Sequence, residues 1–268
     1  MKKLLVCGKG GTGKSVIVTL LTNVLSEDGY TVLAIDSDES NPGLYRALGF
    51  ETAPSPIVNL FGGKRQVEEI VDRVSRSGGT EEMASEELAK TFAREKISLA
   101  DIPSKYILQR DNIKLMTVGK IAAAYEGCAC PMGVAIKAFL KKVVLKDNEL
   151  VIVDTEAGIE HFGRGVHAGI DTVLIVAESS FESIALAAKI NFMAKKSQID
   201  HIYAVLNKAP TPEIEAKAQA ELLKRGIKMI GTIPYDPQVA EACLEGRPLP
   251  ESKAREAVRK IVDELMRP

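Results

Sequence analysis

The sequence lacks several features that would assign it to particular classes of protein. It has only four cysteines in 268 residues, too few for a scaffold held together by disulfides. Its formal net charge of −1 argues against a general nucleic-acid-binding or membrane-binding surface. No apolar run approaches the roughly 20 residues of a membrane-spanning helix, and we find no internal repeat or low-complexity tract. The sequence therefore predicts a soluble, cytoplasmic protein that binds neither nucleic acid nor membrane.

The length and composition indicate a folded chain with a sizeable core. Hydrophobic residues make up 46% of the sequence and charged residues 26%, a balance that supports a packed interior and does not suggest disorder. A doubly wound sheet with added segments can use this length as one domain, although length alone would also allow two. We predict a single domain over residues 1–268.

One glycine-rich stretch organises the rest of the sequence. It lies between an apolar run at 4–6, which predicts a buried strand, and a predicted helix at 16–25, and it reads Gly8-Lys9-Gly10-Gly11-Thr12-Gly13-Lys14-Ser15. This pattern in this context is typical of a phosphate-binding P-loop, in which backbone N–H groups and a helix N-terminus surround one anion. Lys14 would reach the β- and γ-phosphates and Ser15 would ligate Mg²⁺. The alternative is a strand-to-helix turn that binds no ligand.

Acidic residues follow two further predicted strands. The run at 31–35 leads to Asp36 and Asp38, and the run at 150–154 ends in Asp154. Ligands of open α/β sheets bind at the carboxyl edge of the strands, where the P-loop also lies. We therefore place Asp36 and Asp154 near Mg²⁺. Glu156 and Gly158 lie in the following switch II loop, where the Gly158 N–H is suited to sensing the γ-phosphate.

The remaining pattern alternates strands and helices. It predicts an α/β fold with a doubly wound, mostly parallel sheet flanked by helices, interrupted at about 51–111 by a helical insertion of undetermined role. Within the insertion we expect helices at 66–74 and 81–93, the second capped by Thr80. Beyond it the expected strands are 113–118, 172–177, 201–206 and 228–233, and the expected helices are 134–146, 181–196, 212–225, 238–246 and 251–266.

Two of the four cysteines form a C-x-C pair, Cys128 and Cys130, directly before a predicted helix. The field of a helix N-terminus stabilises thiolates, the form that binds metal ions. One pair cannot complete a four-coordinate site, but two pairs brought together by a twofold dimer would form Cys₄. A pair of buried structural cysteines and a redox-active dithiol remain alternatives. Cys7 and Cys243 are unpaired in the sequence and are interpreted as core or surface residues.

Two histidines, His161 and His167, flank the switch II loop. Neither has a second ligand at metal spacing, so surface or packing roles are favoured.

The lysine at position 9 makes the P-loop more specific. Lys9-Gly10-Gly11-Thr12-Gly13-Lys14-Ser15 resembles the deviant Walker A motif of the MinD/ParA, ArsA and nitrogenase iron protein superfamily. The resemblance implies a P-loop NTPase fold that binds ATP or ADP with Mg²⁺ and hydrolyses ATP. It implies that Lys9 acts across a dimer interface, Lys14 acts on the phosphates, and Asp38 positions the attacking water. Base recognition is expected at Asn207. Lys208 is expected to contribute to nucleotide binding, and the loop Pro234-Tyr235-Asp236 to line the base pocket.

The C-x-C pair and the segment 154–161 narrow the resemblance to the CooC-type ATPases, accessory proteins for nickel insertion into carbon monoxide dehydrogenase. This resemblance implies a homodimer formed on binding ATP or metal, with Ni²⁺ or Zn²⁺ shared between the Cys128 and Cys130 pairs, and carbon monoxide dehydrogenase as the client metalloenzyme. Two alternatives stay open. One is an iron–sulfur electron-transfer ATPase of the nitrogenase iron protein type, and the other is a MinD/ParA-like positioning ATPase.

Overall fold

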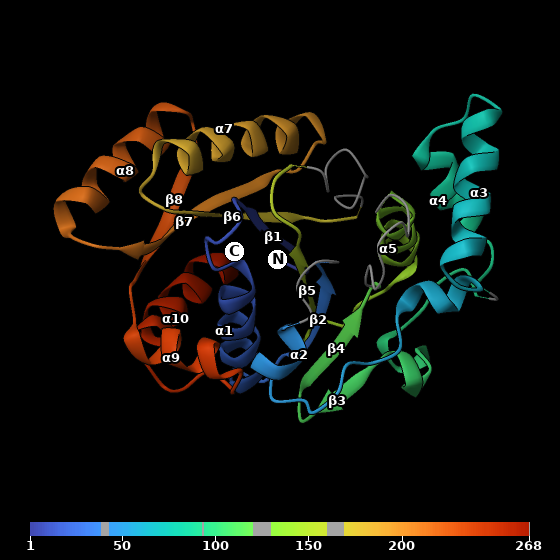
Figure 1. Cartoon of the computed structure of the whole chain (residues 1–268), viewed down its shortest axis with the longest axis horizontal. Coiled ribbons are helices and arrows are strands. Elements are labelled where there is room, and N and C mark those ends of the chain that lie inside the picture. The colour runs from blue at the N-terminus through green and yellow to red at the C-terminus, as the bar shows by residue number, and fades with distance from the viewer. Residues whose placement is uncertain (39–42, 93, 120–129, 160–168, 268) are drawn as a thin grey trace.

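The strands in the described part of the chain form one eight-stranded sheet (Figure 1). A computed structural model describes residues 1–38, 43–92, 94–119, 130–159 and 169–267. The strand order is β3-β4-β2-β5-β1-β6-β7-β8, and every pairing is parallel except β3 with β4. The strands are β1 (Lys3–Gly8), β2 (Thr31–Ser37), β3 (Leu108–Arg110), β4 (Ile113–Thr117), β5 (Glu149–Thr155), β6 (Thr172–Ala177), β7 (His201–Ala209) and β8 (Lys228–Pro234). The predicted mostly parallel α/β fold is confirmed.

Helices cover both faces of this sheet. In β1, Leu4 and Val6 face one hydrophobic core, whereas Leu5 and Cys7 face the other, because alternate strand residues point to opposite faces. The first core packs against α1 (Lys14–Glu27), α2 (Leu44–Ala47), α9 (Pro237–Glu245) and α10 (Lys253–Met266). The second packs against α3 (Lys64–Arg76), α4 (Glu81–Ala89), α5 (Cys130–Lys142), α7 (Phe181–Lys196) and α8 (Pro212–Lys224). Both faces are therefore buried, which explains the continuous apolar strand sequences.

Most predicted elements are confirmed, and several of their ends are corrected. Strand β6 and helix α7 begin and end where the sequence predicted. The helix expected at 81–93 is capped by Thr80 but ends at Ala89, where the Lys90 N–H already bonds to the Glu86 and Glu87 carbonyls as a C-cap. Strand β7 continues to Ala209, three residues beyond the predicted end.

The helix expected at 134–146 starts and ends four residues earlier, as α5. At its C-terminal end the chain pairs with Ile97 instead of continuing the helix. The Ile97 N–H donates to the Lys142 carbonyl at 2.9 Å, and the Val144 N–H donates to the Ile97 carbonyl at 2.9 Å. The bridge joins Ile97 and Val143, which are far apart in the sequence, so the local periodicity of 134–146 cannot predict it.

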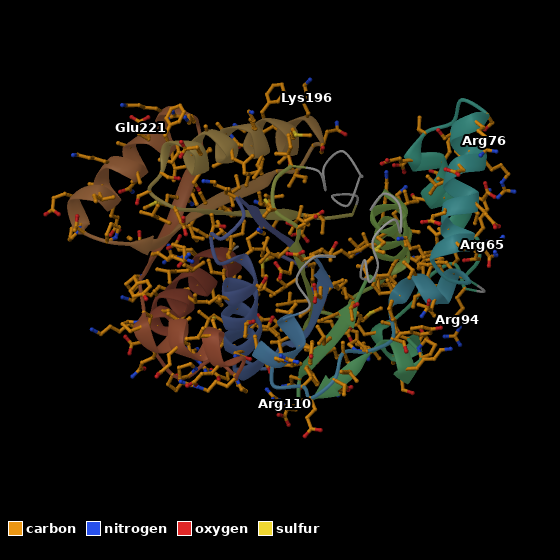
Figure 2. The ribbon with its side chains drawn as sticks, viewed as in Figure 1. Arg65, Arg76, Arg94, Arg110, Lys196 and Glu221 are labelled. Atoms are coloured by element: carbon orange, nitrogen blue, oxygen red, sulfur yellow. The ribbon has the colours of Figure 1, made fainter. Side chains whose placement is uncertain are left out.

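The segment 51–111 packs beside the sheet through helices α3 and α4, which lie against α5 (Figure 1). Glu82 of α4 forms ion pairs with both Lys137 and Lys141 of α5. Desolvation of the largely buried Lys137 lowers its pKa. On the opposite side of α3, Arg65 and Arg76 point outward (Figure 2). The segment therefore presents an apolar and ionic inner face to α5 and a charged outer face to solvent.

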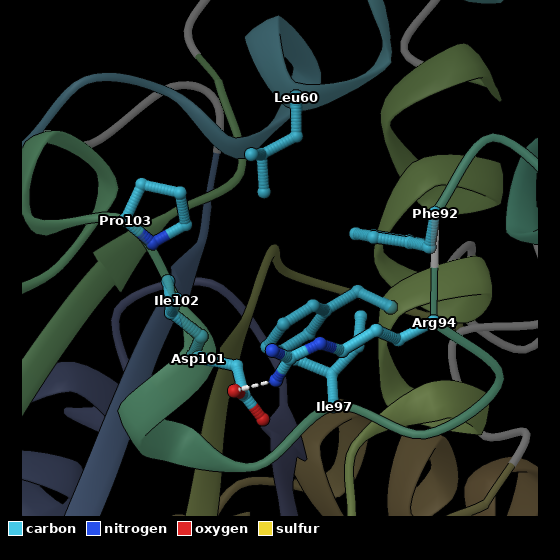
Figure 3. A pocket seen from close by; sticks show the side chains of 8 residues that line it. Leu60, Phe92, Arg94, Ile97, Asp101, Ile102 and Pro103 are labelled. Carbon is cyan, nitrogen blue, oxygen red and sulfur yellow. Dashed lines mark hydrogen bonds and ion pairs between the residues drawn. The ribbon is translucent and has the colours of Figure 1, made fainter.

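Three short elements in this segment were not predicted: the 3₁₀ helices η1 (Ile57–Phe61), η2 (Leu99–Asp101) and η3 (Ser104–Tyr106). Strand β3 was not predicted either, and it adds an antiparallel edge to the sheet. A cavity of about 350 Å³ lies between η1, Phe92, the segment 94–103 and Phe139 of α5, with an Arg94–Asp101 ion pair at its side (Figure 3). Within the described ranges, no helix combines the length and hydropathy needed to cross a bilayer.

Candidate functional site: a P-loop with buried carboxylates

The P-loop begins where β1 ends at Gly8, and its backbone requires glycine. A Cβ at Gly8 would lie 2.3 Å from the carbonyl oxygen of Val176 on β6, closer than any side chain allows. Gly11 and Gly13 have φ angles of 81° and 88°, in the left-handed region that favours glycine. The Thr12 hydroxyl donates to the Lys9 carbonyl at 2.8 Å. These constraints fix a tight loop between strand and helix, as the sequence predicted.

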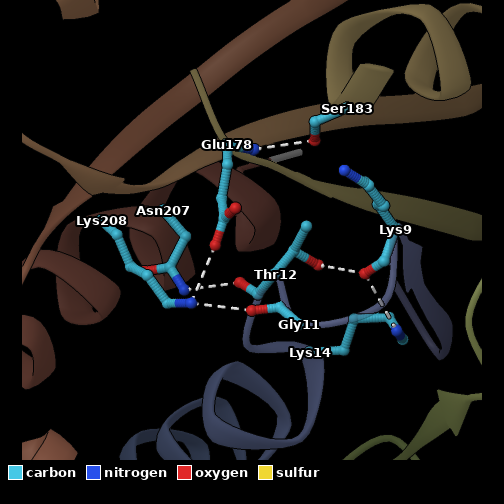
Figure 4. Close-up of polar contacts among 8 residues, drawn as sticks. All are labelled: Lys9, Gly11, Thr12, Lys14, Glu178, Ser183, Asn207 and Lys208. Carbon is cyan, nitrogen blue, oxygen red and sulfur yellow. Dashed lines mark hydrogen bonds and ion pairs between the residues drawn. The ribbon is translucent and has the colours of Figure 1, made fainter. Parts of the chain in front are cut away.

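Lys14 begins α1 and points back into the loop. Its Nζ atom lies 3.5 Å from the Gly8 carbonyl oxygen and 3.4 Å from that of Lys9, and the residue is only 7% exposed (Figure 4). Gly13 precedes α1 without a side-chain cap, so a ligand can take that place at the helix N-terminus. An ammonium group and a helix N-terminus converge here, which suits a bound phosphate. Lys9, by contrast, is exposed.

Asp36 and Asp154 meet at the carboxyl ends of β2 and β5, where they are register partners. They are 3% and 1% exposed, and both Asp154 carboxylate oxygens are buried without a hydrogen-bond partner. The pKa of Asp154 is raised to about 7, chiefly because burial disfavours its charged form; the Asp36 carboxylate adds to the rise, and Ser15 and Lys14 oppose it. Two buried carboxylates beside a serine form a donor set of oxygen atoms. This arrangement fits Mg²⁺, which would supply the charge that the orphaned oxygens lack.

Asp38 lies beside this pair and borders the main cleft of the site. Its backbone N–H donates to Asp36 Oδ1 at 3.2 Å. The cleft has a volume of about 700 Å³, large enough for a nucleotide. Its walls come from the P-loop, from α2 and from the end of α9, and they include Gly10, Gly11, Gly13, Lys14, Ser15, Asp38, Arg46, Ala157, Cys243, Arg247 and Leu249.

The start of the switch II loop contacts the P-loop directly. The Gly158 N–H, predicted to sense the γ-phosphate, donates here to the Gly8 carbonyl at 3.1 Å. The Thr155 hydroxyl donates to the Val6 carbonyl at 2.9 Å. Glu156 lies between these two anchored residues, at the end of β5. The structure therefore brings the first part of switch II next to the phosphate-binding loop.

The nucleotide-binding residues predicted outside the P-loop lie in two different places. The buried Asn207 donates from Nδ2 to the Thr12 carbonyl at 2.7 Å, and Lys208 donates from Nζ to the Gly11 carbonyl at 2.7 Å (Figure 4). Pro234, Tyr235 and Asp236 are not among the described residues that line the cleft. Asp236 instead caps α9, where its carboxylate accepts from the Gln238 N–H at 3.0 Å.

Several residues of the site were missed by the sequence analysis. Arg46, Cys243 and Arg247 line the cleft, and Glu178 forms an ion pair with Lys208 at 2.8 Å. The only available signal was their position near predicted strand ends or in the closing helices. These four residues belong to no sequence motif. They reach the site only through packing between segments that are distant in the sequence.

The cysteines cannot be placed together from the described residues. Cys128 lies outside them, as do His161 and His167, and Cys130 is described only as the first residue of α5. Cys7 is fully buried in the core, where desolvation raises its pKa to about 12, and Cys243 is exposed. In the part of the chain that the structure describes, no three His, Cys, Asp or Glu side chains form a metal-binding group.

The sequence matches the family model of the CobQ/CobB/MinD/ParA nucleotide-binding domain over residues 4–249. The chain belongs to this family of P-loop nucleotide-binding proteins. It is 40% identical to an uncharacterized ATP-binding protein of Methanocaldococcus jannaschii, over 92% of this chain and 93% of the relative. It is 30% identical to the carbon monoxide dehydrogenase accessory protein CooC of Rhodospirillum rubrum, over 98% of this chain and 97% of that protein.

Two further proteins show a more distant similarity to this chain. A cytosolic Fe-S cluster assembly factor, the Nubp1 homolog of Drosophila yakuba, is 24% identical over 99% of this chain and 81% of its own length. Among solved structures, the septum site-determining protein MinD of Pyrococcus horikoshii, complexed with Mg-ADP, has a TM-score of 0.68. Its identity is 21%, and the match covers 99% of this chain and 96% of MinD. The likeness to MinD establishes the fold.

Proposed function

We propose that this chain is a cytoplasmic ATPase that dimerises with ATP and assists nickel insertion into carbon monoxide dehydrogenase. The observation that carries the proposal is its 30% identity with the accessory protein CooC along nearly the whole of both chains. The P-loop with its buried Lys14, Asp36 and Asp154 supplies the nucleotide chemistry that such a role requires. The C-x-C pair at the start of α5 supplies the candidate thiolates.

In this proposal each residue of the site has a separate role in ATP binding or hydrolysis. Lys14 and the P-loop amides hold the phosphates, and Asp38 orients the attacking water. Lys9 reaches the nucleotide of the partner subunit, which suits an exposed side chain. Ser15, Asp36 and Asp154 would hold Mg²⁺, which neutralises phosphate charge when bound. Base recognition is assigned to Asn207, Lys208 contributes to nucleotide binding at the P-loop, and Pro234, Tyr235 and Asp236 form a neighbouring segment.

The metal ion is cargo in this scheme. Cys128 and Cys130 of two subunits bind one Ni²⁺ or Zn²⁺, because four thiolates complete a tetrahedral site and two do not. ATP bound between the subunits favours the closed dimer only through contacts that the open form lacks. Metal binding and ATP binding are then linked, and each strengthens the other. Movement of Glu156 and Gly158 after hydrolysis reopens the dimer and releases the ion.

A second candidate function is the assembly or use of an iron–sulfur cluster. It is favoured by the similarity to the Fe-S cluster assembly factor Nubp1 homolog, which also extends over most of both chains. The same four thiolates would then hold iron and sulfide. The C-x-C spacing is compact for such a cluster, so nickel or zinc is preferred.

The deciding experiment measures metal content and oligomeric state of the full chain, purified without oxygen, with and without Mg-ATP. We expect about half a nickel or zinc ion per chain and a metal-dependent dimer. The double variant Cys128→Ser/Cys130→Ser should lose the bound metal ion and the metal-dependent dimer, and it should still bind ATP. Cys243→Ser, which changes an exposed cysteine outside the pair, is the matched control for metal content, which should equal that of the unmodified chain. A nickel-deficient carbon monoxide dehydrogenase should be reactivated by the chain with ATP and nickel.

Three other outcomes would contradict the proposal. Iron and sulfide with broad visible absorption would indicate the iron–sulfur function. No metal under any nucleotide condition would indicate a positioning ATPase. Loss of ATP binding in the double cysteine variant would mean that the pair is structural.

A further inference from the structure

Asn207 and Lys208 are neighbours in β7, yet both side chains reach the P-loop (Figure 4). Successive residues of a regular strand point to opposite faces of the sheet. Here the register of β7 against β8 shifts between Asn207 and Ala209, and Lys208 has a φ angle of 55°, in the left-handed region. A bulge of this kind re-aims a side chain. The irregularity therefore turns Lys208 to the same side as Asn207.

The two side chains hold consecutive carbonyl groups of the P-loop. Asn207 takes the Thr12 carbonyl and Lys208 takes the Gly11 carbonyl, each at 2.7 Å. In a trans peptide the C=O and N–H bonds point in opposite directions. Holding the Thr12 carbonyl against β7 therefore turns the Gly13 N–H away from β7. Holding the Gly11 carbonyl likewise turns the Thr12 N–H inward, where it donates to the Lys9 carbonyl at 3.3 Å.

Glu178, just after β6, fixes Lys208 from the other side. Its carboxylate accepts from Lys208 Nζ at 2.8 Å, and its backbone N–H donates to the Ser183 hydroxyl of α7 at 2.9 Å. The Lys208 ammonium is thus shared between the carboxylate of Glu178, whose backbone N–H is bonded to α7, and a carbonyl of the P-loop. Lys208 and Glu178 are 43% and 32% exposed at their side chains, so solvent weakens but does not remove this interaction.

We infer that Glu178 and Lys208 are positioning residues for nucleotide binding: together they hold the Gly11 carbonyl so that the P-loop is shaped for phosphate before the nucleotide arrives. The inference rests on nucleotide binding at this loop, which is part of the proposed function. It requires neither the metal nor the client enzyme. A loop shaped in advance loses less freedom on binding, which strengthens affinity.

The test is whether Glu178→Gln strengthens or weakens Mg-ATP binding. If Lys208 acted only as a free positive charge on the phosphates, Glu178→Gln would remove a nearby negative charge and strengthen Mg-ATP binding. If Glu178 holds Lys208 on the loop, the same substitution weakens binding. We expect Glu178→Gln and Lys208→Met each to weaken Mg-ATP binding about tenfold, the effect of a charged hydrogen bond. Lys208→Arg, which keeps charge and donors, should recover most of the loss.

The variants are compared by titration calorimetry and by steady-state ATP hydrolysis with the full chain. KM should rise with the dissociation constant while kcat changes little, since positioning acts on ground state and transition state alike. Glu221→Gln and Lys224→Met are matched controls, because this exposed pair on α8 has Nζ and Oε1 2.7 Å apart and lies outside the cleft. The controls should bind like the unmodified chain.

Each result has one meaning. Tighter binding in Glu178→Gln, or unchanged binding in Lys208→Met, overturns the positioning role while leaving nucleotide binding intact. A fall in kcat with unchanged KM also overturns it. Failure of the unmodified chain to bind Mg-ATP would instead remove the proposed function. Thermal unfolding of all variants without nucleotide confirms that the comparison is between folded proteins.

Discussion

Asp36 and Asp154 face each other as register partners on adjacent strands, and both are almost completely buried. Two carboxylates this close in a dry site disfavour each other's ionised form, and burial adds to the effect. The pKa of Asp154 accordingly rises to about 7 from an ordinary value of 3.8. Without a cation, the free energy of unfolding therefore falls as the pH rises toward about 7 and Asp154 ionises.

This strain predicts that Asp154→Asn stabilises the chain free of metal and nucleotide. The folded-state pKa of Asp154 lies above its ordinary value, so the folded chain holds this proton more tightly than the unfolded chain. Stability from this group is complete below about pH 4 and is lost as the pH rises to about 7. At pH 8 we expect the variant to melt about 5 °C or more above the unmodified chain, with the two converging near pH 4. Thermal unfolding with chelator at both pH values measures this.

The exposed Asp147 provides the control for that comparison, since its side chain is fully accessible. Asp147→Asn should give no pH-dependent difference. A melting temperature of Asp154→Asn below that of the unmodified chain at pH 8 would mean that the carboxylate is already satisfied.

Asp38→Ala should separate binding from hydrolysis. Asp38 borders the cleft, whereas Lys14 lies against the P-loop carbonyls. We expect Mg-ATP affinity within about threefold of the unmodified chain and turnover reduced at least about tenfold. Phosphate release and calorimetry measure the two quantities. Lys14→Ala is the contrast, since it should abolish binding itself. Full turnover in Asp38→Ala would place the catalytic role elsewhere.

Gly8→Ala should be far more destabilising than Gly29→Ala. Both glycines have positive φ angles, of 151° and 90°, but only Gly8 has an atom within contact range of an added Cβ. That atom is the Val176 carbonyl oxygen, which belongs to β6 and cannot move alone. We expect about 1 kcal/mol for Gly29→Ala from backbone strain and at least about 3 kcal/mol for Gly8→Ala. Urea unfolding measures the loss of unfolding free energy in each variant. Equal losses would show that β6 shifts to accommodate the added Cβ at little cost.

Cys243 should report nucleotide binding through its reactivity. It is exposed at the wall of the cleft, while partial burial raises its pKa, so alkylation should accelerate as the pH rises from 7 to 9. Saturating Mg-ATP should slow the reaction about tenfold or more by covering the cleft. The fully buried Cys7 should remain unmodified in the folded chain. Mass spectrometry of the labelled cysteine follows the reaction; equal rates with and without Mg-ATP would place the nucleotide away from α9.

The parts of the fold that the sequence predicted well are those with strong local patterns. The apolar run at 172–177 and the helical pattern at 181–196 predicted β6 and α7 with their bounds. The glycines of the P-loop carry their own backbone requirement, which is why Gly8, Gly11 and Gly13 could be recognised without a structure.

The parts that could not be predicted depend on partners distant in sequence. The early end of α5 follows from pairing with Ile97, and the cleft wall at Arg46 and Arg247 exists only after α2 and α9 pack against α1. Strand β3 is three residues long, too short to show a period. The orientation of the Lys208 side chain depends on a register shift between β7 and β8, and no residue type in the sequence predicts that shift.

The central position of β1 has a consequence for the order in which the molecule opens. Strand β1 is paired on both sides, with β5 and with β6, and its residues from Leu4 to Cys7 are completely buried. Amide hydrogens in such a strand exchange with solvent only when the whole fold opens. The phosphate-binding loop is thus tethered at one end to the slowest-exchanging part of the protein, so β1 should stay protected while helices at the margin open and close.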